Sequence, residues 1–140
     1  MSFVAPRALA TLALVDSAQR IAALAEGMRV LHTGCLAHNV LWFYRDAIEA
    51  HLKAGDLEQA KACATMLEQY TRQDPLPWSQ FVIERGRSLA EYAEGRRDHA
   101  LFEELANLKG HGERAGLNIA LPAITAALAG SDFADVQAAM

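Results

Sequence analysis

The segment from residue 39 to residue 54, NVLWFYRDAIEAHLKA, constrains the fold more than any other part of the chain. At helical spacing it has two mainly apolar rows, one with Leu41, Tyr44, Ile48, His51 and Leu52 and the other with Phe43, Ala47, Ala50 and Ala54. Between them runs one narrow polar stripe, spaced so that neighbouring charges can pair. A helix with two apolar sides needs neighbours on both, so the segment predicts a stacked array of helices.

Gly, Pro and Asn residues divide the rest of the chain into further segments with helical period. We expect about seven helices, at 6–15, 17–31, 39–54, 57–72, 77–94, 97–108 and 121–130, and leave open whether the sixth continues through GHGERAG (110–116). Their N-caps are expected at Asp16 or Ser17, at Asn39 and at Asp56. Alanine is abundant and no segment has the pattern of a strand, which predicts an all-α fold. We expect one domain over residues 1–140, with a repeat core at about 17–116 and capping helices at 1–16 and 117–140.

A weak internal repeat indicates how the helices stack. AGDLEQA (54–60) and EGRRDHA (94–100) place Gly55 and Gly95 40 residues apart, and Ala60 and Ala100 equally far apart. Each glycine is expected to end a helix, and each small alanine to let the returning helix pack closely. This is the helix-turn-helix pattern of tetratricopeptide repeats, whose usual period is about 34 residues. The prediction is an α-α superhelix of antiparallel helix pairs.

Three stretches, HNVLWFYRDAIE, YTRQDPLPWSQF and RGRSLAEYAEGRRD, carry a family resemblance. The region from about residue 20 to residue 128 resembles the tetratricopeptide-like helical region at the C-terminal end of bacterial class III adenylate/guanylate cyclase and ATPase regulator proteins. The resemblance implies an interaction or regulatory module of a signalling protein. It carries over no catalytic residue, because the chain has neither a GxxxxGK[ST] phosphate loop nor paired metal-binding aspartates. Whether the chain is a fragment or free-standing stays open.

Charge and cysteine content narrow the class of partner. The formal net charge is −4 and the basic clusters are short, which predicts no binding to nucleic acid. The apolar run near the N-terminus is interrupted by Pro6, Arg7 and Thr11, so we expect neither a signal peptide nor a membrane span. The two cysteines form no CxxC pair and are expected to be free thiols in the cytoplasm.

The candidate residues for partner binding are aromatic and charged. Trp42, Arg45 and Glu49 share one region of the third expected helix, and Trp78 lies at the turn marked by prolines. Tryptophan beside arginine is typical of interface hot spots. The alternative interpretation is that Trp78 fills the turn between repeats. These residues predict a non-catalytic scaffold that binds a protein partner and needs no cofactor.

Arg85 is a candidate for a structural role. Arg85 falls on an apolar row of its helix, where it needs a carboxylate partner such as Asp46 or Glu49, unless its guanidinium extends to solvent at the edge of the row.

A short array of helices has two open ends, which bear on assembly. In a homodimer, the first helix or the segment IALPAITAALAG could cover one of these ends, and we therefore expect two copies of the chain to associate.

A different class of function rests on His32, Cys35 and His38, spaced H-x2-C-x2-H. This spacing suits metal ligands, but a structural zinc site needs a fourth, and His51 and Cys63 lie on other helices. Either cysteine with a histidine base would alternatively make a thiol enzyme. The simpler interpretation is a helix end, a turn and a new helix start, with Cys63 in the core. A ligand sensor with an apolar pocket between the third and fifth helices is a further alternative.

Overall fold

The structure, a computed structural model, describes residues 4–34 and 37–140. Within these ranges it is all helical and contains no strand, so the predicted fold class is confirmed. The elements are α1 (Ala5–Val15), α2 (Arg20–His32), α3 (Ala37–Ala54), α4 (Leu57–Thr71), α5 (Pro77–Ala93), α6 (His99–Ala115), the 3₁₀ helix η1 (Asn118–Ala120), α7 (Leu121–Leu128) and α8 (Phe133–Ala138).

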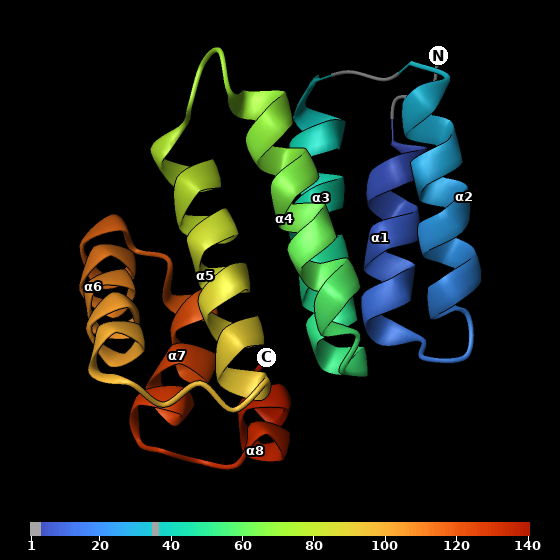
Figure 1. The fold of residues 1–140 in the computed structure, drawn as a ribbon. Coiled ribbons are helices and arrows are strands. Elements are labelled where there is room, and N and C mark those ends of the chain that lie inside the picture. Colours follow the sequence, from blue (N-terminus) through green and yellow to red (C-terminus); the bar gives the residue numbers. More distant parts are fainter. Residues whose placement is uncertain (1–3, 35–36) are drawn as a thin grey trace.

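The helices pack in neighbouring pairs to form a superhelix of two layers (Figure 1). The odd-numbered helices contact one another in the order α1, α3, α5 and α7, and we call this row the odd-helix layer. The even-numbered helices pack against their odd-numbered neighbours on the other side, as α4 does in front of α3 (Figure 1). Because α3 lies between α1 and α5 and also contacts α4, it needs the two apolar sides that its sequence provides.

The two repeat glycines end helices in the same way. Gly55 and Gly95 both have left-handed backbone conformations, with φ of 73° and 97°. At each, the backbone N–H groups of the glycine and of the next residue donate to carbonyls in the last turn of the preceding helix. This arrangement suits glycine because it has no Cβ to clash in the left-handed region. The predicted helix ends are therefore found at both positions.

The predicted equivalence of Ala60 and Ala100 in the repeat is not found. Asp56 caps α4 and Asp98 caps α6, and these caps are 42 residues apart, so the second turn is two residues longer than the first. Ala60 is fully buried, whereas Ala100 is exposed. The expected packing role for Ala100 is therefore wrong. Phe102, which is half-buried, stands at the position of α6 that corresponds to Ala60.

Several helix boundaries differ from expectation. Helix α2 begins at Arg20 with Gln19 at its N-cap, so the predicted cap at Asp16 or Ser17 is wrong. Helix α3 begins at Ala37, so Asn39 lies inside the helix with 1% of its surface exposed and is not its N-cap. Helix α6 continues through two glycines to Ala115, so of the two ends left open by the sequence the later one is found. A Cβ added at the second of these, Gly112, would lie 2.6 Å from Leu121 Cδ2, so α6 packs closely against this leucine. The short helix α8 was not expected.

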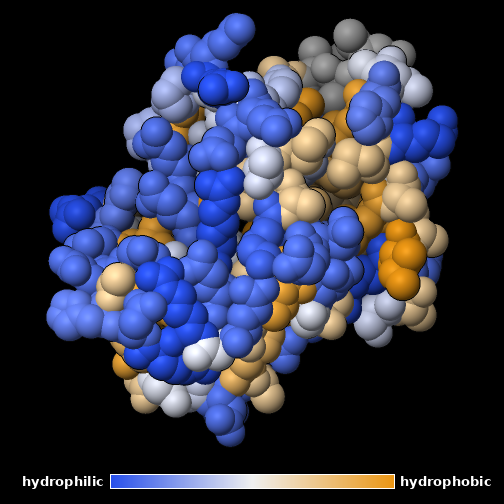
Figure 2. Space-filling view, in the orientation of Figure 1, coloured by the Kyte–Doolittle hydropathy of each residue, from blue (hydrophilic) through white to orange (hydrophobic). Residues whose placement is uncertain are grey.

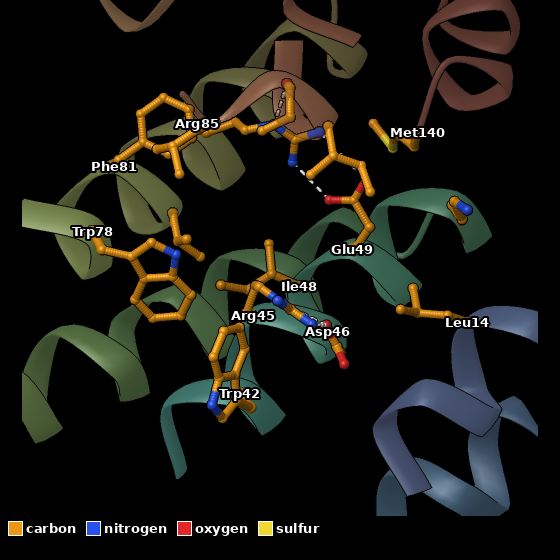
Figure 3. Close-up of a pocket in the computed structure, with 15 residues that line it drawn as sticks. Leu14, Trp42, Arg45, Asp46, Ile48, Glu49, Trp78, Phe81, Arg85 and Met140 are labelled. Atoms are coloured by element: carbon orange, nitrogen blue, oxygen red, sulfur yellow. Dashed lines mark hydrogen bonds and ion pairs between the residues drawn. The ribbon is translucent and has the colours of Figure 1, made fainter. Parts of the chain in front are cut away.

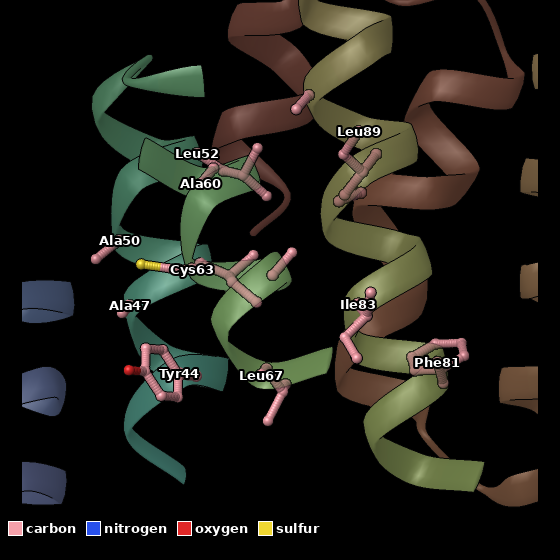
Figure 4. Packing of buried hydrophobic residues seen from close by; sticks show 14 of the residues in the cluster. Tyr44, Ala47, Ala50, Leu52, Ala60, Cys63, Leu67, Phe81, Ile83 and Leu89 are labelled. Atoms are coloured by element: carbon pink, nitrogen blue, oxygen red, sulfur yellow. The ribbon is translucent and has the colours of Figure 1, made fainter. Parts of the chain in front are cut away.

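Apolar side chains from both layers form one core (Figure 4). The largest fully buried ones include Phe43, Leu67 and Tyr92. Ala47 and Ala50 point from α3 toward the N-terminal helices, and Leu67 and Ile83 fill the space between α4 and α5 (Figure 4). Within the described ranges, no helix has the length and apolar character to span a bilayer.

Candidate functional site

A pocket of about 410 Å³ opens on the odd-helix layer between α3 and α5. Its side walls are Trp42, Arg45, Asp46, Ile48, Glu49 and Lys53 of α3, and Trp78, Phe81, Val82 and Arg85 of α5. Other segments complete it with Leu14, Leu117, Ile119, Ala120 and Met140. Figure 3 shows the two tryptophans at one end, with Leu14 and Met140 on the other side. The pocket thus brings together all four residues that the sequence suggested for partner binding.

The two tryptophans contact each other although 36 residues separate them. Their ring centroids lie 5.4 Å apart with an angle of 61° between the planes, an edge-to-face arrangement. The Arg45 guanidinium lies 4.4 Å from the centroid of the Trp42 ring, and that of Arg7 lies 5.0 Å from it. Both tryptophans are half-buried. The alternative interpretation, that Trp78 only fills the turn between repeats, is therefore incomplete, because part of its ring also lines the pocket.

Arg85 spans the pocket and joins three segments. Only 6% of it is exposed, and its partner is Glu49 rather than Asp46. The guanidinium donates to both carboxylate oxygens, over 2.6 Å to Oε2 and 3.3 Å to Oε1, and its Nε donates to the Ala120 carbonyl over 3.0 Å. This two-pronged geometry is the one that arginine provides and lysine does not. It fixes α5 against α3 and holds the end of η1 in place.

A second ion pair lies closer to the tryptophans. Asp46 is 3% exposed and accepts a 2.6 Å hydrogen bond from Arg45 Nε and a 3.4 Å one from the Thr11 hydroxyl of α1. Both carboxylates of the pocket are thus paired with arginines. Lys53 forms no ion pair or side-chain hydrogen bond with the residues that the structure describes, which leaves the pocket with one unpaired positive charge.

Several residues of the pocket were not suggested by the sequence. Ile119 is 92% exposed at the rim, and Met140 reaches the pocket because the C-terminal segment folds back over α3. The Gln137 side-chain amide donates to the carbonyls of Leu52 and Lys53 over 3.1 and 3.2 Å, which anchors α8 to the end of α3. These contacts join residues that lie more than 80 positions apart in the sequence, so no local periodicity indicates them.

The structure bears only in part on the metal or thiol alternative. His32 and His38 are exposed, and Cys35 lies outside the described residues. No group of three or more His, Cys, Asp or Glu side chains in those ranges could hold a metal ion. Cys63 is buried in the core, and this burial raises the pKa of its thiol to about 11, so it is protonated at neutral pH and a weak nucleophile. A site that includes Cys35 stays a prediction.

No protein-family model matches the chain, and no curated protein and no solved structure matches it either.

Proposed function

We propose that the chain is a non-catalytic interaction module that binds a protein partner on its odd-helix layer. One observation carries the proposal. Trp42, Arg45, Glu49 and Trp78 are suggested by the sequence because of their residue types, and all four line one pocket. The resemblance to helical regions of cyclase-type regulators supports a regulatory role in the cytoplasm.

The arrangement has the properties of an interface anchor. Interface hot spots combine tryptophan and arginine with a well-packed surround that excludes water. Here the ion pair of Arg85 with Glu49 and the edge-to-face tryptophans fix the pocket before a partner arrives. A fixed site loses less side-chain entropy on binding than a flexible one. The exposed Ile119 adds apolar contact area at the rim.

A homodimer is the second part of the proposal. Apolar residues gather over the N-terminal helices in Figure 2, whereas the surface over α4, α5 and α6 is mostly hydrophilic on this face. Val15 and Ile21 are 78% and 85% exposed. Light scattering with protein at high concentration tests this part, and a monomer would contradict it.

Site-specific crosslinking tests the partner proposal. A photo-reactive amino acid would replace Val82 in the pocket or, as the control, the exposed Tyr70 of α4. We expect a defined protein crosslinked from position 82 and not from position 70. The purified partner should then bind the unmodified chain in calorimetry, with affinity reduced at least tenfold by Trp78→Ala. Equal crosslinking from both positions, or unchanged affinity of the variant, would contradict the proposal.

A further inference from the structure

The pocket between α3 and α5 has an apolar lining and a single unpaired charge. We propose that it binds a small amphipathic carboxylate, with the carboxylate at Lys53 and the apolar body against Trp42 and Trp78. This inference goes beyond the partner-binding proposal and does not depend on it, because it can be tested on the purified chain alone.

The charges of the pocket determine the sign of the ligand. Three cationic and two anionic side chains line it, and each carboxylate side chain is already paired with an arginine. Arg85 uses its Nε and both terminal nitrogens on Glu49 and Ala120. Lys53 keeps all three ammonium donors free of described partners. The lining side chains therefore sum to one positive charge, at Lys53, in a chain whose net charge is −4, and an unpaired ammonium group favours an anion over a cation beside it.

The position of Lys53 determines the shape of the ligand. Trp42 and Lys53 stand on the same face of α3, since Glu49 and Asp46 between them also line the pocket. Eleven residues of helix separate them along the axis by about 16 Å. A ligand that contacts both ends is therefore elongated, with its charge at one end. Leu14 and Met140 line the pocket on the side away from the two tryptophans (Figure 3).

The size and lining favour a small molecule. A volume of about 410 Å³ lies within the range of roughly 300–1,000 Å³ that is usual for small-ligand sites. Ile48, Phe81, Val82 and Leu117 supply apolar walls between the two ends. Such walls remove the hydrocarbon part of a ligand from water, while the single lysine orients it.

Intrinsic fluorescence reports directly on this site, because Trp42 and Trp78 are the two tryptophans of the chain and both line the pocket. The probes are decanoate, decanamide and decylammonium, which share one hydrocarbon body and differ in charge. We expect decanoate to bind with one site per chain, at least fivefold more tightly than either other probe, in fluorescence titration and calorimetry below its micelle concentration.

Variants assign the preference to Lys53. Lys53→Met should reduce the affinity for decanoate to that for decanamide, whereas Lys53→Arg should keep the preference. Lys109→Met, which removes a lysine of α6 outside the pocket, is the control and should change nothing. Val82→Phe should weaken all probes by filling the pocket.

Three results would overturn the proposal. The first is that no probe binds, and the second is that decanoate binds no more tightly than decanamide. The third is a preference for decanoate that survives Lys53→Met. Because none of these measurements involves a protein partner, their failure would leave the crosslinking test of partner binding unaffected.

Discussion

The two flanks of α3 differ in how closely the next helix approaches. On the side of α1 and α2, small residues predominate, and Ala47 and Ala50 point toward these helices (Figure 4). Gly27 of α2 lies so near Phe43 that an added Cβ would be 2.3 Å from the ring. On the side of α5, the close approach is at Gly86, where an added Cβ would be 2.7 Å from Ile48, and the pocket opens beside it.

This difference indicates which side of α3 has space for a ligand or a partner. Alanine and glycine let helices come into contact and leave no space between them. Beside the close contact at Gly86, the two tryptophans and the ion pair of Arg85 with Glu49 border the pocket between α3 and α5. The buried charged groups of the pocket, Asp46 and Arg85, are both paired, so the pocket remains stable without a ligand. We call the first side of α3 the tight flank and the second the open flank.

The largest expected effect is on the tight flank. Phe43→Ala should decrease the free energy of unfolding by about 3–5 kcal/mol, because the ring is fully buried and close-packed surroundings relax only partly around a cavity. Trp78→Ala, at a half-buried residue of the open flank, should have a clearly smaller effect. Urea unfolding followed by circular dichroism measures both. Similar losses would contradict the difference between the flanks.

Breaking the ion pair across the open flank should give the next largest loss of stability. Arg85→Met leaves Glu49, whose side chain is 19% exposed, without its partner. We expect a loss of about 2–4 kcal/mol, at or below the usual range for breaking a buried pair because Glu49 keeps some contact with water. The double variant with Glu49→Leu should recover most of it, since no buried charge then remains. A double variant as unstable as Arg85→Met would show that packing of the arginine, rather than its charge, is what matters.

Adding one methyl group to each flank gives a smaller and more direct contrast. Gly27→Ala should destabilise by about 1–2 kcal/mol, because the clash is with a fully buried ring and overpacking of a dense core is unfavourable. Gly86→Ala should have less effect, because Ile48 borders the pocket and can move toward it. Thermal unfolding compares the two variants. A larger loss for Gly86→Ala would contradict the assignment of open space to that flank.

The smallest effect is a dependence on pH. Burial lowers the pKa of His51 below its usual value, and nearby Arg20 lowers it further, against the opposing effect of Asp56. Below about pH 6.5 the unfolded chain therefore binds a proton that the folded chain resists, so stability decreases as pH falls toward the folded pKa. Urea unfolding at pH 7.5 and 5.5 measures this decrease.

His51→Gln should reduce the decrease between these two pH values, and His99→Gln, at a histidine whose side chain is 93% exposed, should not. The lowered pKa values of the Asp98 and Glu68 carboxyls act only at lower pH, outside this window. An unchanged pH dependence in His51→Gln would contradict the role of burial.

Local patterns in the sequence predict most of the fold. The two sides of α3 and the glycines at positions 55 and 95 act through neighbouring residues, so they can be recognised without the structure. Ala100 was misplaced because Arg96 and Arg97 lengthen the second turn, and the cap residue Asp98 was the better marker of register. Helix α6 continues through both of its glycines, and Gly112 lies close to Leu121, a tertiary contact that the local pattern does not indicate.

The site is less predictable than the fold. Residue type identified Trp42, Arg45, Glu49 and Trp78, and the need of a buried arginine for a carboxylate led to Glu49 as one of two partners. Nothing local indicates that the two tryptophans meet or that the C-terminal segment reaches Lys53. Those contacts depend on how the helix pairs stack, which the periodicity of single helices does not determine.

One comparison of two enlarged side chains tests the difference between the flanks most directly. Ala47→Leu adds volume to the tight flank, where the alanine is 1% exposed, and Val82→Phe adds volume to the pocket. We predict that urea unfolding will show a loss of about 2–3 kcal/mol for Ala47→Leu and a change within about 0.5 kcal/mol for Val82→Phe. Equal destabilisation by the two substitutions would contradict an open, ligand-accessible space between α3 and α5.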